Sequence, residues 1–109
     1  MTNRPIEAPV PCNGPLYSKW KPQHYLAKVI EEAGEVGKAY LDFEMCGGKP
    51  EKVNAHWIRL MCECADLHNA ITSFQESLNC DAADRQYFTH MINESNRHRD
   101  GGRRIAKKE

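Results

Sequence analysis

The sequence predicts an all-α fold, an antiparallel helical bundle of three main helices that is completed by oligomerisation. Apolar residues recur at helical spacing in three long segments, proline and glycine separate these segments, and no stretch alternates as a β-strand would. A chain of 109 residues is long enough for one domain with a modest core. Because three helices alone leave much of their apolar stripes in water, we expect a homo-oligomer.

The chain begins with a proline-rich N-terminal arm, residues 1–16. Four prolines in this arm remove backbone donors and fix an extended path that excludes a helix. Ser18 is the expected cap of the helix that follows, and Pro22 fits the first turn of that helix. The predicted helical domain spans residues 17–99, and residues 100–109 form a basic, flexible C-terminal tail.

The first helix is expected to run from Pro22 to about Met45, where two consecutive glycines stop it. At about 100° of rotation per residue, its apolar stripe consists of Leu26, Val29, Ala33, Val36, Tyr40 and Phe43. Gly34 and Gly37 weaken this helix, each by roughly 0.5–1 kcal/mol relative to alanine. These glycines indicate that another backbone or a ligand comes close to the helix.

The second helix is predicted from Pro50 to about Leu78. Its apolar stripe consists of Trp57, Leu60, Met61, Cys64, Leu67, Ile71, Phe74 and Leu78. Asp81 is the expected cap of the third helix, and Asp84, three residues later, completes a capping box. This helix is expected to fray beyond Asn96, and its apolar contacts are Tyr87, Met91 and Ile92.

Composition narrows the classes of function. The 15 Lys and Arg residues balance 15 Asp and Glu residues, so net charge does not indicate a nucleic-acid or membrane partner. The sequence lacks both the apolar run of a secretory signal and the roughly 20 apolar residues that span a bilayer. We therefore expect a cytoplasmic protein that does not bind membranes.

Two acidic pairs, one on each of the first two helices, form a candidate metal site. Glu32 and Glu35 lie three residues apart, as do Glu63 and Asp66, so each pair presents its oxygens in one direction. Both pairs flank an apolar stripe and face the neighbouring helix, where their mutual repulsion is costly unless a cation neutralises it. Oxygen ligands without histidine or thiolate favour Mg²⁺, or Mn²⁺, over zinc. One pair alone is usually solvated surface, but two pairs on successive helices favour a metal site.

The acidic pattern also resembles a known family. EExxE, from Glu31 to Glu35, is followed after 27 residues by ExxD, from Glu63 to Asp66. This resembles the all-alpha NTP pyrophosphatase superfamily, with its MazG-like proteins, dimeric dUTPases and phosphoribosyl-ATP pyrophosphohydrolases, over about residues 21–99. The resemblance implies a magnesium-dependent hydrolase that splits a (deoxy)nucleoside triphosphate into the monophosphate and pyrophosphate, and it implies a homodimer or a homotetramer.

Several site residues follow from this resemblance. It implies that Mg²⁺ is held by Glu32, Glu35, Glu63 and Asp66. It also implies phosphate contacts from a lysine, an asparagine and an arginine of the third helix. Asn96 and Arg99 fit this pattern best, and Asn93 with Arg97 is the alternative register. The lysine has no counterpart in this chain.

Other residues near the acidic pairs are candidates for catalysis or substrate binding. Glu31 and Glu35 are the candidates for orienting the attacking water. Lys28 and His24, one and two turns before Glu32, reach towards phosphate or base, with a surface ion pair and a polar helix start as the alternatives. Arg59, one turn before Glu63, is expected to pair with it.

Aromatic residues are candidates for stacking on a base, because a ring face accepts any base. They are Tyr17, Trp20, Tyr40 and Trp57. Core packing is the favoured interpretation of Tyr40 and Trp57, whereas Trp20, beside the arm, is open to either role.

Three competing interpretations stay open. A thiol site would use Cys64 and His68, with Cys46 from the loop, although a buried thiol and a core histidine are the ordinary explanation. A di-iron bundle needs Glu-x-x-His pairs, and neither acidic pair supplies the histidine. A non-enzymatic helical module that binds nucleic acid or protein through its basic tail is the main alternative function.

Overall fold

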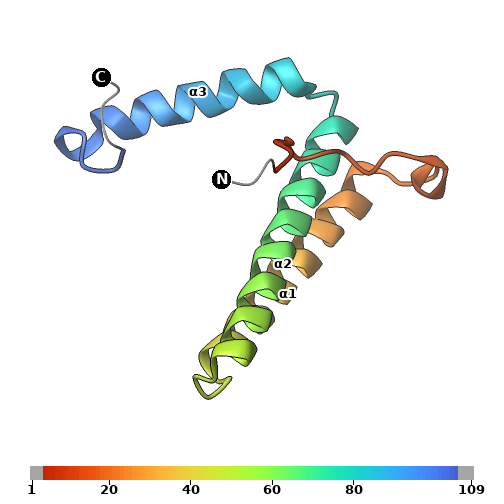
Figure 1. Cartoon of the computed structure of the whole chain (residues 1–109). Coiled ribbons are helices and arrows are strands. Elements are labelled where there is room, and N and C mark those ends of the chain that lie inside the picture. Colours follow the sequence, from red (N-terminus) through yellow and green to blue (C-terminus); the bar gives the residue numbers. More distant parts are fainter. Residues whose placement is uncertain (1–3, 106–109) are drawn as a thin grey trace. The chain divides into compact units, whose positions relative to one another are not determined.

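The computed structural model describes residues 4–105 of the chain, and it is all-helical as predicted. Three main helices, α1 (Pro22–Glu44), α2 (Pro50–Ser77) and α3 (Ala82–His98), are joined by short loops, with no strand among the described residues (Figure 1). Two short 3₁₀ helices, η1 (Pro15–Tyr17) and η2 (Arg99–Gly101), flank them. The chain divides into two compact units, Met1–Leu78 and Asn79–Glu109, which we describe separately.

Helix α1 begins and ends largely where the sequence predicts. It begins at Pro22, but Ser18 is not its cap, so that prediction is wrong. Ser18 instead closes η1, donating its backbone N–H to the carbonyl of Pro15, and the cap position of α1 belongs to Lys21. After α1, Gly47 adopts a φ of 81°, a left-handed conformation that glycine reaches without steric cost and that ends a helix.

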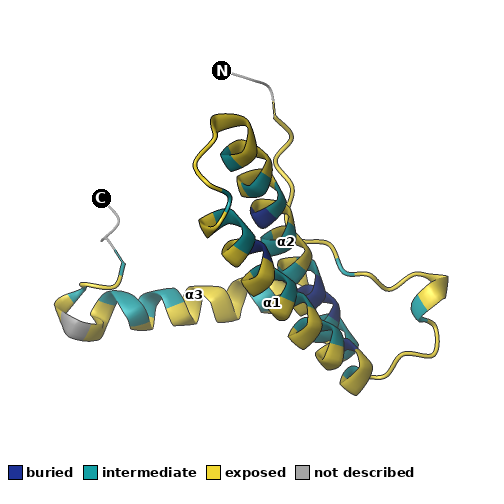
Figure 2. Ribbon diagram, turned by 90° about the horizontal axis from the view of Figure 1, so that it is seen from below, coloured by how far each residue is buried: buried dark blue, intermediate teal, exposed yellow. Residues whose placement is uncertain are grey.

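Helices α1 and α2 form a hairpin with a thin core. The buried apolar residues of the described chain are Tyr25 and Ala39 on α1 and Leu60 and Ala70 on α2, and they lie where the two helices face each other (Figure 2). No large side chain is less than 2% exposed in the described chain. A two-helix contact covers one narrow seam of each helix, which explains why so little is buried.

The predicted apolar stripes are therefore only partly correct. On α1, Val29 and Phe43 are half-buried, but Tyr40 remains 46% exposed. On α2, Leu60 is buried, whereas Trp57 remains 50% exposed. The expected core packing of Tyr40 and Trp57 is wrong for this chain by itself, because the stripe of each helix is wider than the seam that one neighbouring helix covers.

The exposed apolar residues of the hairpin gather on one side. We call this surface the back face; it consists of Leu26, Ile30, Tyr40 and Leu41 of α1 and Trp57, Met61 and Ile71 of α2. At about 100° per residue, these side chains lie on the flank of each helix opposite its acidic pair. Since the acidic flanks of α1 and α2 meet on one side of the hairpin, the two apolar flanks share the other side.

The N-terminal arm is attached to α2 by two hydrogen bonds. Through its backbone N–H, Val10 donates to Oδ1 of Asn69 at 3.0 Å, and Cys12 donates to Oγ of Ser73 at 2.7 Å. Residues 4–12 have no regular secondary structure, as the prolines predict. The arm thus lies along a defined face of α2.

The second unit consists of α3 and η2. The predicted capping box is confirmed, because Asp84 donates its N–H to Oδ1 of Asp81 at 2.9 Å and Asp81 donates its N–H to Oδ2 of Asp84 at 3.3 Å. The expected apolar contacts of α3, Tyr87, Met91 and Ile92, are all exposed on this unit by itself, so their packing partner stays a prediction. Of the predicted basic tail, residues 106–109 lie outside the described part of the chain.

Candidate metal centre

Three of the predicted metal ligands come together between α1 and α2. One carboxylate oxygen from each of Glu32, Glu63 and Asp66 lies within 4.8 Å of the other two. Mg²⁺ holds oxygens at about 2.0–2.1 Å in octahedral geometry, which places opposite ligands about 4.2 Å apart. Small side-chain rotations therefore suffice for the three oxygens to share one ion.

Burial makes this acidic trio more than a solvated surface cluster. The side chain of Glu32 is only 12% exposed and Glu63 is half-buried, while Asp66 is exposed at the edge. Repulsion between carboxylates rises as water is removed around them, so a trio of this kind favours a bound cation. The exposed edge at Asp66 leaves an approach for a ligand from solvent.

Glu35, the fourth predicted ligand, is not a member of the trio. It is half-buried one turn after Glu32, and its charge acts on Arg59, helping to raise the pKa of that guanidinium. The largest cause of the raised Arg59 pKa is its hydrogen bond with Asp42. The two-helix arrangement thus brings together three of the four carboxylates that the sequence singles out.

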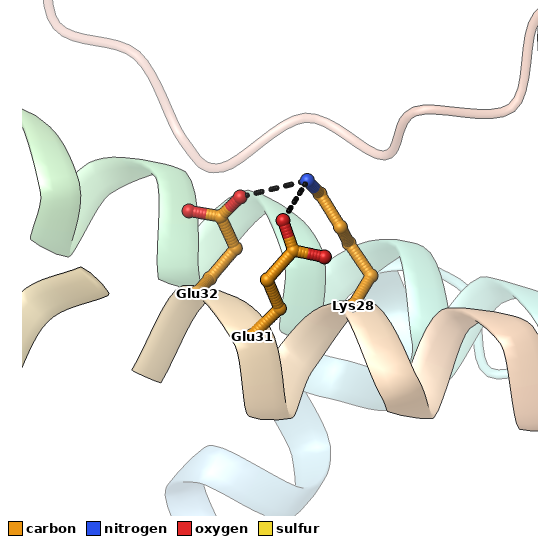
Figure 3. A network of polar contacts seen from close by, with 3 residues as sticks. All are labelled: Lys28, Glu31 and Glu32. Atoms are coloured by element: carbon orange, nitrogen blue, oxygen red, sulfur yellow. Dashed lines mark hydrogen bonds and ion pairs between the residues drawn. The ribbon is translucent and has the colours of Figure 1, made fainter. Parts of the chain in front are cut away.

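Lys28 is the internal counter-ion of the centre. Its Nζ lies 3.0 Å from Glu32 and 3.3 Å from Glu31, and all three side chains project from the same side of α1 (Figure 3). The hydrogen bond to Glu32 is the largest cause of the raised pKa of Lys28. Glu31 is 62% exposed and lies at the outer edge of this network, as the helical rotation predicts.

A cross-helix ion pair next to the trio was not expected from sequence. Arg59 of α2 forms its ion pair with Asp42 of α1 at 2.6 Å, and their hydrogen bond lowers the pKa of Asp42. Glu63, the pairing candidate within α2, acts on Arg59 only through its charge. Both residues lie on the acidic flanks of their helices, and that shared flank is the signal that would have indicated the pair.

A pocket of about 230 Å³ opens beside the trio. Its charged lining comes from Lys28, Glu32 and Asp66, and its aromatic lining comes from Tyr17, Trp20 and Tyr25. The pocket thus combines a candidate metal site with an aromatic wall, at a size near the lower end of small-molecule sites.

The aromatic wall is one packed cluster. The ring centroid of Trp20 lies 4.8 Å from that of Tyr17 and 5.2 Å from that of Tyr25, both edge-on. Only Tyr25 is buried, and Trp20 is 36% exposed. The sequence left open whether Trp20 packs in the core or faces a ligand. In the structure it lines the pocket and does not belong to the hairpin core.

The remaining predicted site residues have local partners or belong to the second unit. His24 accepts a hydrogen bond from the backbone N–H of Lys21 at 2.8 Å through Nδ1, the polar helix-start role. Asn96 and Arg99 belong to the second unit, at the end of α3 and the start of η2. In the alternative register, Arg97 pairs with Glu94.

The competing thiol interpretation gains no geometric support. Within the described residues, the acidic trio is the one group of three or more possible ligands close enough to hold an ion. Cys46, Cys64 and His68 are not part of it.

Comparison with known proteins did not identify a relative of this chain. No protein-family model matches the chain, and neither the curated proteins nor the solved structures contain a significant match. Among the described residues, no helix has the length and apolar character needed to cross a bilayer.

Proposed function

We propose that this protein is a Mg²⁺-dependent nucleoside triphosphate pyrophosphohydrolase of the MazG-like kind, with Mn²⁺ as an alternative ion. The observation that carries the proposal is the acidic trio, built from two helices, with a pocket beside it whose wall is aromatic. Carboxylate oxygens suit a hard divalent cation, and a triphosphate is a ligand that needs one. The resemblance of EExxE and ExxD to the NTP pyrophosphatases supports hydrolysis between the α- and β-phosphates.

The trio and its neighbours divide the chemical roles. Bound Mg²⁺ would neutralise charge that develops on the phosphates in the transition state. Glu32, Glu63 and Asp66 would hold this ion, and Glu35 would join them or accept a proton from the attacking water. Glu31, at the outer edge, is the second candidate for orienting that water.

Substrate contacts come from the pocket. With the ion held by Glu32, the ammonium group of Lys28 would be free to bind a phosphate, since its positive charge suits a carboxylate or a phosphate equally. Trp20 and Tyr17 offer faces or edges to the base. His24, Asn96 and Arg99 remain proposed phosphate or base contacts, carried by the resemblance alone.

The test is a pyrophosphate-release assay over a panel of NTPs and dNTPs with Mg²⁺ or Mn²⁺. Glu32→Gln, Glu35→Gln and Asp66→Asn should each lower kcat by about 100-fold or more, because each removes charge that stabilises the transition state. Glu51→Gln, an exposed residue in the first turn of α2, is the matched control and should keep full activity. Equal release by the wild type and all variants would rule out this centre; salt-dependent DNA binding without release would favour the helical binding module instead.

We also propose that the protein is a homodimer or homotetramer assembled through the back face. Between Leu26 and Leu41 of α1, every charged residue lies on the flank of Glu32, and between Trp57 and Ile71 of α2 every charged residue lies on the flank of Glu63. The seven back-face side chains, each roughly half exposed, present on the order of 700 Å². A stable protein–protein interface buries about 800 Å² per partner.

A further inference from the structure

The arm and α2 meet through a specific pattern of donors and acceptors. Pro9-Val10-Pro11-Cys12 offers only two backbone N–H groups, because proline has none. Both are used: Val10 donates to Asn69 and Cys12 donates to Ser73, residues that lie 59 and 61 positions later in the chain. Backbone donors two residues apart in an extended chain point to the same side, so both N–H groups can reach acceptors on α2 at the same time. The two hydrogen bonds thus fix the register of this segment along α2.

The acceptors belong to the same face of α2 as a candidate metal ligand. Asp66, Asn69 and Ser73 follow each other at helical spacing, and all three line the pocket beside the trio. Ser73 is buried and its hydroxyl also donates to the backbone carbonyl of Asn69 at 2.8 Å, which fixes the oxygen that accepts from Cys12. The arm is thus held at a fixed distance from the metal ligands.

The arm continues directly into the pocket wall. Cys12, which donates to Ser73, also lines the pocket. From there the chain passes through η1 to Tyr17 and Trp20, and both of these rings line the pocket as well. The metal and phosphate side of the pocket, in contrast, comes from Lys28, Glu32 and Asp66 of the helices. Apart from Tyr25, which belongs to α1, the aromatic side of the pocket thus comes from the chain before the helices, and the charged side comes from α1 and α2.

We propose that the N-terminal arm positions the nucleoside-binding wall of the pocket, the rings of Tyr17 and Trp20 that directly follow it, and that Asn69 and Ser73 are positioning residues that dock the arm. This inference rests on the proposed function, because it assigns one part of the substrate to one part of that site. The arm determines affinity for the nucleoside portion, and the helices determine affinity for metal and phosphates.

The experiment compares two ligands that share phosphates and differ in the nucleoside. Dissociation constants for the NTP and dNTP panel and for inorganic tripolyphosphate are measured with Mn²⁺, together with KM and kcat. Val10→Pro removes one arm donor while keeping the extended path, and Asn69→Ala and Ser73→Ala remove the acceptors. Each should weaken nucleotide binding and raise KM about threefold to tenfold, the usual net effect of one hydrogen bond. Affinity for Mn²⁺ and tripolyphosphate, and kcat, should not change.

Two variants of α2 are matched controls. Ser77→Ala removes a hydroxyl that donates within the helix, to Phe74, and Asn54→Ala removes an exposed amide at the other end. Both should leave nucleotide binding unchanged. The double variant Val10→Pro, Asn69→Ala should bind nucleotide no more weakly than either single variant, because each substitution removes the same hydrogen bond.

The outcomes separate this inference from the proposed function. Binding of nucleotide without hydrolysis by the wild type would overturn the pyrophosphohydrolase proposal, while the binding constants would still test the arm. Hydrolysis with unchanged nucleotide affinity in the docking variants, or equal losses for nucleotide and tripolyphosphate, would overturn the arm proposal. A wild type that binds no nucleotide would overturn both.

Discussion

Lys28 pairs with Glu32, the carboxylate of the candidate metal centre whose side chain is only 12% exposed. Its ammonium group is shared between Glu31 and Glu32, so a divalent cation that binds Glu32 has to compete with it. The pair is partly solvent-exposed, and such ion pairs contribute only about 0.2–1 kcal/mol. Lys28 would therefore modulate the proposed metal binding without blocking it.

This competition predicts a direction for metal affinity. Lys28→Ala should bind Mn²⁺ in the absence of nucleotide about twofold to fivefold more tightly, because Glu32 loses its internal partner. It should also bind nucleotide more weakly if the ammonium group contacts phosphate. Electron paramagnetic resonance titration of free Mn²⁺ measures the first effect, with Lys38→Ala as the control on the same helix. Weaker Mn²⁺ binding by Lys28→Ala would contradict the counter-ion role.

Asp42 and Arg59 give a pH-dependent contribution to the stability of the hairpin. Arg59 lowers the folded-state pKa of Asp42 below its usual value of 3.8. A carboxylate of this kind stabilises the fold above its unfolded pKa, and this stabilisation disappears as the pH falls through the folded pKa. Asp42→Asn should thus melt at a lower temperature than the wild type at pH 7, and the difference should vanish on acidification below the folded pKa. Thermal melts followed by circular dichroism across this range provide the measurement; a difference that persists in acid would assign the effect to packing.

The acidic residues also show what the sequence predicts at this scale. Helical spacing correctly predicted that Glu63 and Asp66 lie on one flank of α2 and that this flank faces Glu32 of α1. It did not indicate that Glu35 stays outside the trio or that Asp42 pairs with Arg59. Both depend on the register between α1 and α2, which is set by three-dimensional packing and leaves no periodic signal within one helix.

At the scale of the elements, local chemistry predicts the ends of helices better than their buried faces. Proline, glycine and the Asp81 capping box act within a few residues, so the bounds of α1, α2 and α3 follow from the sequence. The prediction that Ser18 caps α1 was wrong because Ser18 instead ends η1. The prediction of the buried faces was only partly correct because a helix that packs against one other helix buries less than its full apolar stripe.

The capping box predicts a local loss when it is removed. Asp81→Ala leaves N–H groups of the first turn of α3 without their acceptor, which costs about 0.5–2 kcal/mol. Faster amide exchange should be confined to that turn, measured by hydrogen exchange with mass spectrometry. Gln86→Ala, an exposed change on the same helix, should leave exchange there unaltered, and equal protection in both variants would show that the cap is dispensable.

At the scale of the whole molecule, the thin core accounts for the proposed self-association. The exposed back face consists of large apolar side chains, and Ile30 is 66% exposed within it. Gly37 lies on the same flank of α1, with nothing within 4 Å of the position its Cβ would occupy, which leaves room for a neighbouring helix to approach closely. Nothing lies within 4 Å of the corresponding position at Gly34 either, so a close contact at these glycines stays a prediction.

The back face predicts how assembly responds to charge. Ile30→Asp should weaken self-association by at least about tenfold, because an unpaired carboxylate would have to be desolvated at the interface. Sedimentation velocity over a concentration series measures the change. Lys38→Glu alters the charge on the opposite flank and should leave the association state as in the wild type. A wild type that stays monomeric at high concentration would show that another partner covers this surface.

The separation of flanks on the hairpin has a consequence for how copies would work together. On each of α1 and α2 the acidic residues lie on one side and the exposed apolar residues on the other. Copies joined through their apolar sides would therefore turn their candidate metal centres outward. The acidic trio of each candidate centre comes from a single hairpin, so no residue of a second copy would be needed to hold its ion. Turnover should accordingly scale with the number of chains, with a Hill coefficient close to one for substrate, whatever the size of the assembly.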